Sequence, residues 1–156
     1  MKVKPNYIII PLITILISVL GSWFTSQGMD GWYENLVKPE WTPDGSFIGA
    51  MWTFIYVLVT GVVLIYWNKY KDDPRFKLVI GLFILNAFLN VTWSLSFFTL
   101  ELLAFSFAHI IALNLTILAL IVLIWPTSKY LAIALIPYTA WVTVASVLNY
   151  SIWMLN

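Results

Sequence analysis

Residues 102–125 read LLAFSFAHIIALNLTILALIVLIW and contain no aspartate, glutamate, lysine or arginine. A helix that crosses the hydrocarbon core of a bilayer needs about 20 consecutive residues that are mostly apolar. This stretch meets that requirement without a single charged residue. It therefore predicts a membrane-spanning helix, with which the rest of the chain can be compared.

Four other segments have the same character, and they lie at about 6–26, 46–68, 76–99 and 129–153. Of the 156 residues, 62% are hydrophobic and 10% are charged, whereas a soluble domain has about 25% charged residues. The first segment is longer than the usual signal-peptide core of about 7–15 residues, and no A-x-A cleavage site follows it. We therefore expect an all-α integral membrane protein in which residues 1–156 form a single bundle of five transmembrane helices.

Basic residues are distributed unevenly between the two ends of the predicted bundle. One end holds Lys2, Lys4, Lys69, Lys71, Arg75, Lys77 and Lys129. The opposite end holds only Lys38. Loops rich in lysine and arginine stay in the cytoplasm, so the pattern predicts a cytoplasmic amino terminus. The carboxyl terminus and the loop after the first helix are then outside.

The loop at residues 27–45 is the only long connection, and it reads QGMDGWYENLVKPEWTPDG. Its two tryptophans, its tyrosine and its two prolines make it a poor flexible linker. They suit a lid that packs on the mouth of the bundle, formed by Trp32, Pro39, Trp41 and Pro43. The alternative is that Trp32 and Trp41 only anchor the loop at the membrane interface.

Trp52, Trp93 and Trp141 lie inside long apolar runs, where an indole needs a partner for its N–H. Each has polar, aromatic or small neighbours at helical spacing, and these are Tyr56, Asn86, Asn90, Tyr138, Ala145 and Asn149. Amides inside a bilayer face the bundle or a cavity. We expect an aromatic cavity beneath the lid. The same side chains could instead serve only as contacts between helices.

The predicted fourth helix adds two further features. His109 is the only histidine, and it could contact a ligand or form a structural hydrogen bond. On the opposite face, Ala104, Ala108 and Ala112 form a stripe of small residues that suits close packing within the bundle or in a homodimer.

Several classes of function find no support in the sequence. The absence of cysteine excludes disulfides and thiolate sites, and no set of residues suits a metal site. There is also no catalytic triad, phosphate loop or paired carboxylate. The net charge of +1 gives no support for nucleic-acid binding.

Four segments together resemble the TspO/MBR family, which comprises bacterial tryptophan-rich sensory proteins and the mitochondrial translocator protein, or peripheral-type benzodiazepine receptor. They are Trp32-Tyr33 with Lys38-Pro39-Glu40-Trp41-Thr42-Pro43, Gly49-Ala50-Met51-Trp52, Asn90-Val91-Thr92-Trp93-Ser94, and Pro137-Tyr138-Thr139-Ala140-Trp141 with Asn149-Tyr150 and Trp153. Each segment alone is a weak signal. Their order, the chain length and the five predicted spans make the set specific.

The resemblance implies a bacterial membrane protein, often a homodimer, that binds porphyrins or other tetrapyrroles and benzodiazepine-type compounds. No obligatory cofactor follows; protoporphyrin IX or a haem-like tetrapyrrole is the implied ligand. The family's pocket carries over to Tyr33, Trp52, Tyr56, Asn86, Asn90, Trp93, His109, Trp141, Ala145 and Asn149. Trp52 and Trp141 match the pair implicated in light-dependent breakdown of protoporphyrin by bacterial members of the family.

The sequence departs from the family pattern at three places. Asp44 stands where a second proline is common, and His109 stands where many members have an acidic residue. No basic residue follows Trp153, so the carboxyl-terminal cholesterol motif of animal members is absent. We therefore do not expect high-affinity cholesterol binding.

Three functional hypotheses follow. The first is a tetrapyrrole receptor or carrier that acts in sensing, transport or stress response. The second is photo-oxidative degradation of bound porphyrin by Trp52 and Trp141 as catalytic residues. The third is a small secondary transporter or a structural bundle; the lack of intramembrane charge disfavours ion-coupled transport.

Overall fold

The computed structural model describes residues 4–156. Lys2, one of the basic residues behind the predicted orientation, lies outside the described residues. The helical segments are α1 (Asn6–Gly28), η1 (Met29–Tyr33), α2 (Gly45–Lys69), α3 (Phe76–Ser94), η2 (Leu95–Thr99), α4 (Leu103–Ile124), α5 (Lys129–Ala134) and α6 (Ile136–Leu155). Over these residues there are five helical spans long and apolar enough to cross a membrane. The predicted all-α membrane bundle is confirmed.

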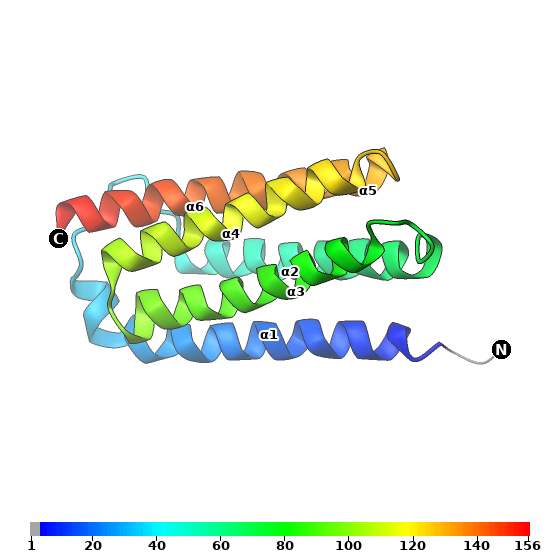
Figure 1. Cartoon of the computed structure of the whole chain (residues 1–156). Coiled ribbons are helices and arrows are strands. Elements are labelled where there is room, and N and C mark those ends of the chain that lie inside the picture. Colours follow the sequence, from blue (N-terminus) through cyan, green and yellow to red (C-terminus); the bar gives the residue numbers. More distant parts are fainter. Residues whose placement is uncertain (1–3) are drawn as a thin grey trace.

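The spans lie side by side, with their connections gathered at two ends (Figure 1). One end carries the segment between α1 and α2, the hairpin between η2 and α4, and the carboxyl terminus; we call it the lid end. The other end carries the start of α1 and the loops at 70–75 and 125–128; we call it the basic end. In the bundle, α4 packs against α3 and α6, while α1 packs against α2 and α3.

The apolar core is centred on α4. Ile110, Leu113 and Ile117 on this helix are fully buried, because residues three and four apart share one face of a helix. Large apolar side chains cover the outside of the bundle instead: Val57 and Val122 are each 69% exposed. A water-exposed surface of this kind would be an aggregation liability, so its place is in lipid.

The first and last spans differ in detail from the predicted ranges. The first continues to Tyr33 through η1, with a kink at Gly31, whose φ of 93° suits glycine. The predicted helix at 129–153 is divided into α5 and α6 at Leu135. Pro137 explains the division, because proline has no N–H to donate to the preceding helical turn.

The close approach of α1 to η2 depends on Gly28. A Cβ at this position would lie 2.0 Å from the carbonyl oxygen of Phe98. Thr99 Oγ1 also donates a hydrogen bond to the carbonyl of Phe24, over 3.1 Å. The end of α1 is therefore held against the hairpin that leads into α4.

We expect Gly28→Ala to destabilise the protein by about 1–3 kcal/mol, the usual cost of overpacking. Gly61→Ala is the matched control, because a Cβ there meets nothing within 4 Å. Its effect should be neutral or stabilising, since alanine has the higher helix propensity. Thermal unfolding in detergent, followed by circular dichroism, measures both. Equal melting temperatures for Gly28→Ala and the wild type would contradict the contact.

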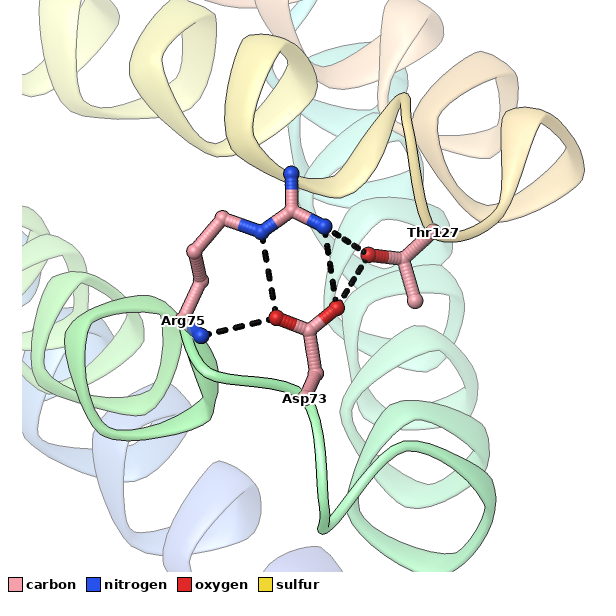
Figure 2. A network of polar contacts seen from close by, with 3 residues as sticks. All are labelled: Asp73, Arg75 and Thr127. Carbon is pink, nitrogen blue, oxygen red and sulfur yellow. Dashed lines mark hydrogen bonds and ion pairs between the residues drawn. The ribbon is translucent and has the colours of Figure 1, made fainter.

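At the basic end, a polar network joins the two loops (Figure 2). Arg75 Nη2 lies 3.0 Å from Asp73 Oδ2 and donates to Thr127 Oγ1 over 2.7 Å. The Thr127 hydroxyl in turn donates to Asp73. The hydrogen bonds from the Arg75 side chain, followed by that from Thr127, lower the pKa of Asp73 from 3.8 to about 2. The network fixes the loop before α3 to the loop before α5.

Asp73→Asn should lower the melting temperature at neutral pH, because the charged carboxylate is the form that the network stabilises. A pKa lowered by folding gives stability that is complete above the unfolded pKa and is lost as the pH falls through the folded pKa. The difference between wild type and variant should be constant from about pH 7 to pH 5 and shrink between about pH 4 and pH 2. A difference that is the same at all of these pH values would show that the charge of Asp73 is irrelevant.

Candidate ligand-binding site

A continuous chain of buried polar side chains joins four helices. Tyr56 OH donates to Asn90 Oδ1 over 2.7 Å, and Asn90 Nδ2 donates to Tyr138 OH over 3.3 Å. Tyr138 OH then donates to Asn86 Oδ1 over 2.9 Å, and Asn86 Nδ2 donates to Thr116 Oγ1 over 2.8 Å. The chain runs from α2 through α3 and α6 to α4. In hydrocarbon these groups have no water to bond with, so the bundle pairs them with one another.

An aromatic wall lies on the lid side of this chain. The ring centroids of Trp52 and Trp93 are 6.4 Å apart, and Trp93 stacks on Phe97 at 5.6 Å. Trp93 Nε1 donates to Asn149 Oδ1 over 3.3 Å. Asn149 Nδ2 reaches Ser106 Oγ at 3.3 Å, which ties α6 to α4. The orientation of Trp93 is thus fixed from both sides.

Two cavities meet at this wall. The smaller, which we call the Trp141 cavity, has a volume of about 60 Å³ and lies among α2, α3, α6 and the lid. The larger, which we call the α1 cleft, has a volume of about 550 Å³ and lies among α1, α2, α3 and the lid. Both are lined by Tyr33, Pro43, Ile48, Trp52, Trp93 and Phe98. Trp52 and Trp93 therefore form a wall common to the two cavities.

The two cavities differ in volume, and the volume decides which of them has the size of a small-molecule site. Small-molecule sites usually have volumes of about 300–1,000 Å³, and the α1 cleft falls in that range. The Trp141 cavity, at about 60 Å³, is far below that range. Trp141 itself is 7% exposed, and its Nε1 has no hydrogen-bond partner within residues 4–156. Trp141 lines only the smaller cavity and does not reach the α1 cleft.

Hydroxyl groups line the α1 cleft. Ser18, Ser22, Thr25 and Ser26 on α1 contribute, and Ser94 of α3 and Thr53 of α2 lie across from them. None of these six residues was predicted from the sequence as part of the site. The spacing of the α1 hydroxyls, at i, i+4, i+7 and i+8, places them on one helix face, and this was the available signal.

The segment at 29–44, which we call the lid, packs on η2. Trp32 lies edge-on to Phe97 at 5.6 Å, and Tyr33 contacts Phe98 at 5.5 Å. Asn156 holds the lid from the other side: its Oδ1 accepts from Val37 N, and its Nδ2 donates to Val37 O, both over 3.0 Å. No pattern in the sequence predicts this contact.

The four predicted lid residues have different positions. Pro43 lines both cavities, and Trp32 packs on the bundle. Pro39 is partly buried, and its carbonyl accepts a hydrogen bond from Thr42 Oγ1 over 2.6 Å. Trp41 is 49% exposed, a position that suits an interfacial anchor.

The predicted pocket residues divide into two groups. The structure brings Tyr33, Trp52, Tyr56, Asn90, Trp93, Trp141, Ala145 and Asn149 to the walls of one or both cavities. Asn86 and His109 line neither. Asn86 forms its hydrogen bonds within the polar chain, to Thr116 and Tyr138. His109 Nε2 lies 3.0 Å from Thr92 Oγ1, with the Phe105 ring beside it. This contact matches the second of the two roles considered for His109, a structural hydrogen bond.

The alanine stripe on α4 faces away from the bundle. Ala104 and Ala108 are exposed, and Ala112 is partly buried. The stripe as a whole therefore does not pack against the other helices of the same chain. It leaves a smooth surface on the outside of this helix.

The chemistry of the cavity walls suits binding. The Trp141 cavity has no carboxylate, lysine, arginine or histidine in its lining. The α1 cleft adds only Lys38 and Asp44, both from the lid. Within residues 4–156 no group of His, Cys, Asp and Glu side chains could hold a metal ion. Stacking and hydrogen bonding are what these walls offer.

Tyr138→Phe should destabilise the bundle by about 1–3 kcal/mol, because it leaves Asn86 and Asn90 each short of a buried partner. Tyr150→Phe, at a position 45% exposed, is the control and should be close to neutral. Reversible unfolding in mixed detergent gives the free energies. Equal values for the two variants would mean that the polar chain contributes nothing to stability.

Comparison with known proteins identifies the family. The profile of the TspO/MBR family matches residues 8–154. A tryptophan-rich protein TspO of Archaeoglobus fulgidus is 36% identical over 146 residues, which cover 93% of each chain. Protein CrtK of Rhodobacter capsulatus is 30% identical over 125 residues, covering 80% of this chain and 78% of the relative. Human translocator protein 2 is 27% identical over 132 residues, covering 83% and 78%.

Proposed function

Because this chain belongs to the TspO/MBR family, we propose that it is a membrane receptor or carrier for tetrapyrroles such as protoporphyrin IX. Benzodiazepine-type compounds are a second class of ligand. The observation that carries the proposal is the Trp52–Trp93 wall facing a cleft of about 550 Å³. Sensing, transport and stress response are the roles that such binding serves.

A flat conjugated ring suits a cleft whose wall is aromatic in one part and carries hydroxyl and amide groups in another. Its face stacks on the indoles of Trp52 and Trp93, which adds about 0.5–1.5 kcal/mol per aromatic pair to the gain from burial. Its polar edge meets Tyr56, Asn90 and the α1 hydroxyls. A few polar groups in a mainly apolar pocket fix the orientation of a ligand.

The surroundings of the site favour binding over ion-coupled transport. Ion-coupled transporters use ionisable residues at membrane depth. Within the described part of the chain, Asp, Glu, Lys and Arg lie at the ends of the spans or in the connections between them. The relatives named TspO and translocator protein are consistent with a sensing or carrier role.

The proposal extends to the setting of the protein. It is a multi-pass protein of a bacterial cell membrane, with its basic end in the cytoplasm and its lid end outside. The exposed stripe at Ala104 and Ala108 provides the surface for a homodimer, because small residues let helices approach closely.

The test is a titration with protoporphyrin IX in lipid nanodiscs in the dark, followed by quenching of tryptophan fluorescence. The wild type should bind saturably, and Trp52→Ala should weaken binding about tenfold through the loss of stacking and burial. Trp125→Ala at the basic end is the control and should leave the affinity unchanged. Quenching that does not saturate in the wild type would refute the proposal.

The photo-oxidative alternative is supported by one observation: Trp52 and Trp141 line the same small cavity, and Trp52 also faces the cleft. Repeating the titration under illumination with oxygen tests it. The alternative requires a new pigment that Trp52→Phe and Trp141→Phe prevent without abolishing dark binding. Equal pigment formation in the wild type and both variants would exclude a role for these indoles.

A further inference from the structure

Lys38 is a cation without a carboxylate partner in the lining of the α1 cleft. Its ammonium donates to the carbonyl oxygens of Tyr33, over 2.6 Å, and Glu34, over 3.3 Å. It also lies 4.6 Å from the centroid of the Tyr33 ring. Within residues 4–156, the one ion pair is Arg75–Asp73, at the opposite end of the bundle. Among the described residues, no carboxylate lies within ion-pair distance of the Lys38 ammonium.

Asp44, the acidic residue of the described cleft lining, does not form an ion pair with the Lys38 ammonium. Asp44 sits at the start of α2, where the positive end of the helix dipole offsets its charge. Lys38 is therefore the cation of the described lining that an anionic group meets at the lid end of the cleft.

The rest of the cleft restricts how a ligand can lie. The hydroxyls of α1 extend over residues 18–26, a rise of about 12 Å at 1.5 Å per residue. Trp52 and Trp93 line the same cleft from α2 and α3. A flat ligand that stacks its face on these indoles leaves its edges for the hydroxyl groups. With its ring in that position, substituents on its end nearest the lid point toward Lys38.

We propose that Lys38 makes the cleft selective for anionic tetrapyrroles by pairing with a ligand carboxylate at the lid. This inference rests on the proposed function and adds to it a specificity-determining residue and an orientation. Protoporphyrin IX binds with its propionate groups toward the lid and its ring against Trp52 and Trp93. Lys38 keeps one hydrogen bond to the lid backbone and turns a free donor toward the carboxylate, since an ammonium has three donors.

The alternative is that Lys38 only fastens the lid through the carbonyls of Tyr33 and Glu34. The two roles differ in what they do to a neutral ligand. Loss of a lid fastening weakens every ligand to the same extent. Loss of a charge partner weakens the acid and spares its ester.

The experiment compares protoporphyrin IX with its dimethyl ester, which has the same ring and no carboxylate. Both are titrated in phosphatidylcholine nanodiscs against the wild type, Lys38→Met, Lys38→Arg and the control Lys77→Met, which lies at the basic end. The quantity compared is the ratio of the two dissociation constants. Differences in membrane partitioning of the two ligands cancel when this ratio is compared among variants.

We expect the ratio to favour the acid at least tenfold more in the wild type than in Lys38→Met, the size of a charge-assisted hydrogen bond. Lys38→Arg should restore most of the preference, and Lys77→Met should match the wild type. An equal ratio in the wild type and Lys38→Met overturns the inference, while the proposed function stands. Equal weakening of both ligands in Lys38→Met also overturns it and assigns Lys38 to the lid alone. Failure of both ligands to bind the wild type refutes the proposed function itself.

Discussion

The requirement that polar groups inside a bilayer be paired within the protein governs this structure. The chain from Tyr56 through Asn90, Tyr138 and Asn86 to Thr116 meets that requirement with side chains from four helices. Each member is held by groups on a neighbouring helix, so none can turn without leaving another unpaired. These hydrogen bonds hold α2, α3, α4 and α6 in their relative positions. The indoles of Trp52 and Trp93 lie on the lid side of this polar chain.

The first helix follows a different rule. Only its glycines, Gly21 and Gly28, are buried, so it adds little to the apolar core. It packs along α2, α3 and η2, and two of its close contacts are specific: Thr60 Oγ1 donates to Thr14 Oγ1 over 2.9 Å, and Gly28 meets the backbone at Phe98. Between these contacts, α1 presents its serines to the space beside α2. The cleft lies beside these serines, among α1, α2 and α3.

Much of the architecture could be predicted because length and apolarity suffice to define a transmembrane span. The convergence of Trp52, Trp93 and Trp141 at one cavity was also predictable, since an indole deep in a span needs an interior position. Helix periodicity gives the face of a residue but not its partner. Asn86 and His109 were therefore placed in the pocket, although they bond with Thr116 and Thr92.

The place of the α1 serines in the cleft could not be predicted from the sequence, and the reason is physical. A hydroxyl in a helix commonly bonds to a carbonyl of the preceding turn, as Thr25 and Ser26 do, so its presence in a span carries little information. The contact between Asn156 and Val37 joins residues 119 positions apart, and no local pattern encodes it. Helix periodicity specifies faces, whereas these features depend on how the faces are assembled.

Ser22 and Thr53 are exposed although both line the α1 cleft. The cleft is therefore open at the surface between α1 and α2, within the spans, where the surroundings are lipid. Under the proposed function, a lipophilic guest enters this opening from the bilayer. Its occupancy then follows its concentration per unit of membrane, so a molecule that is scarce in water can still fill the site. An apparent dissociation constant then varies with the amount of lipid that shares the ligand.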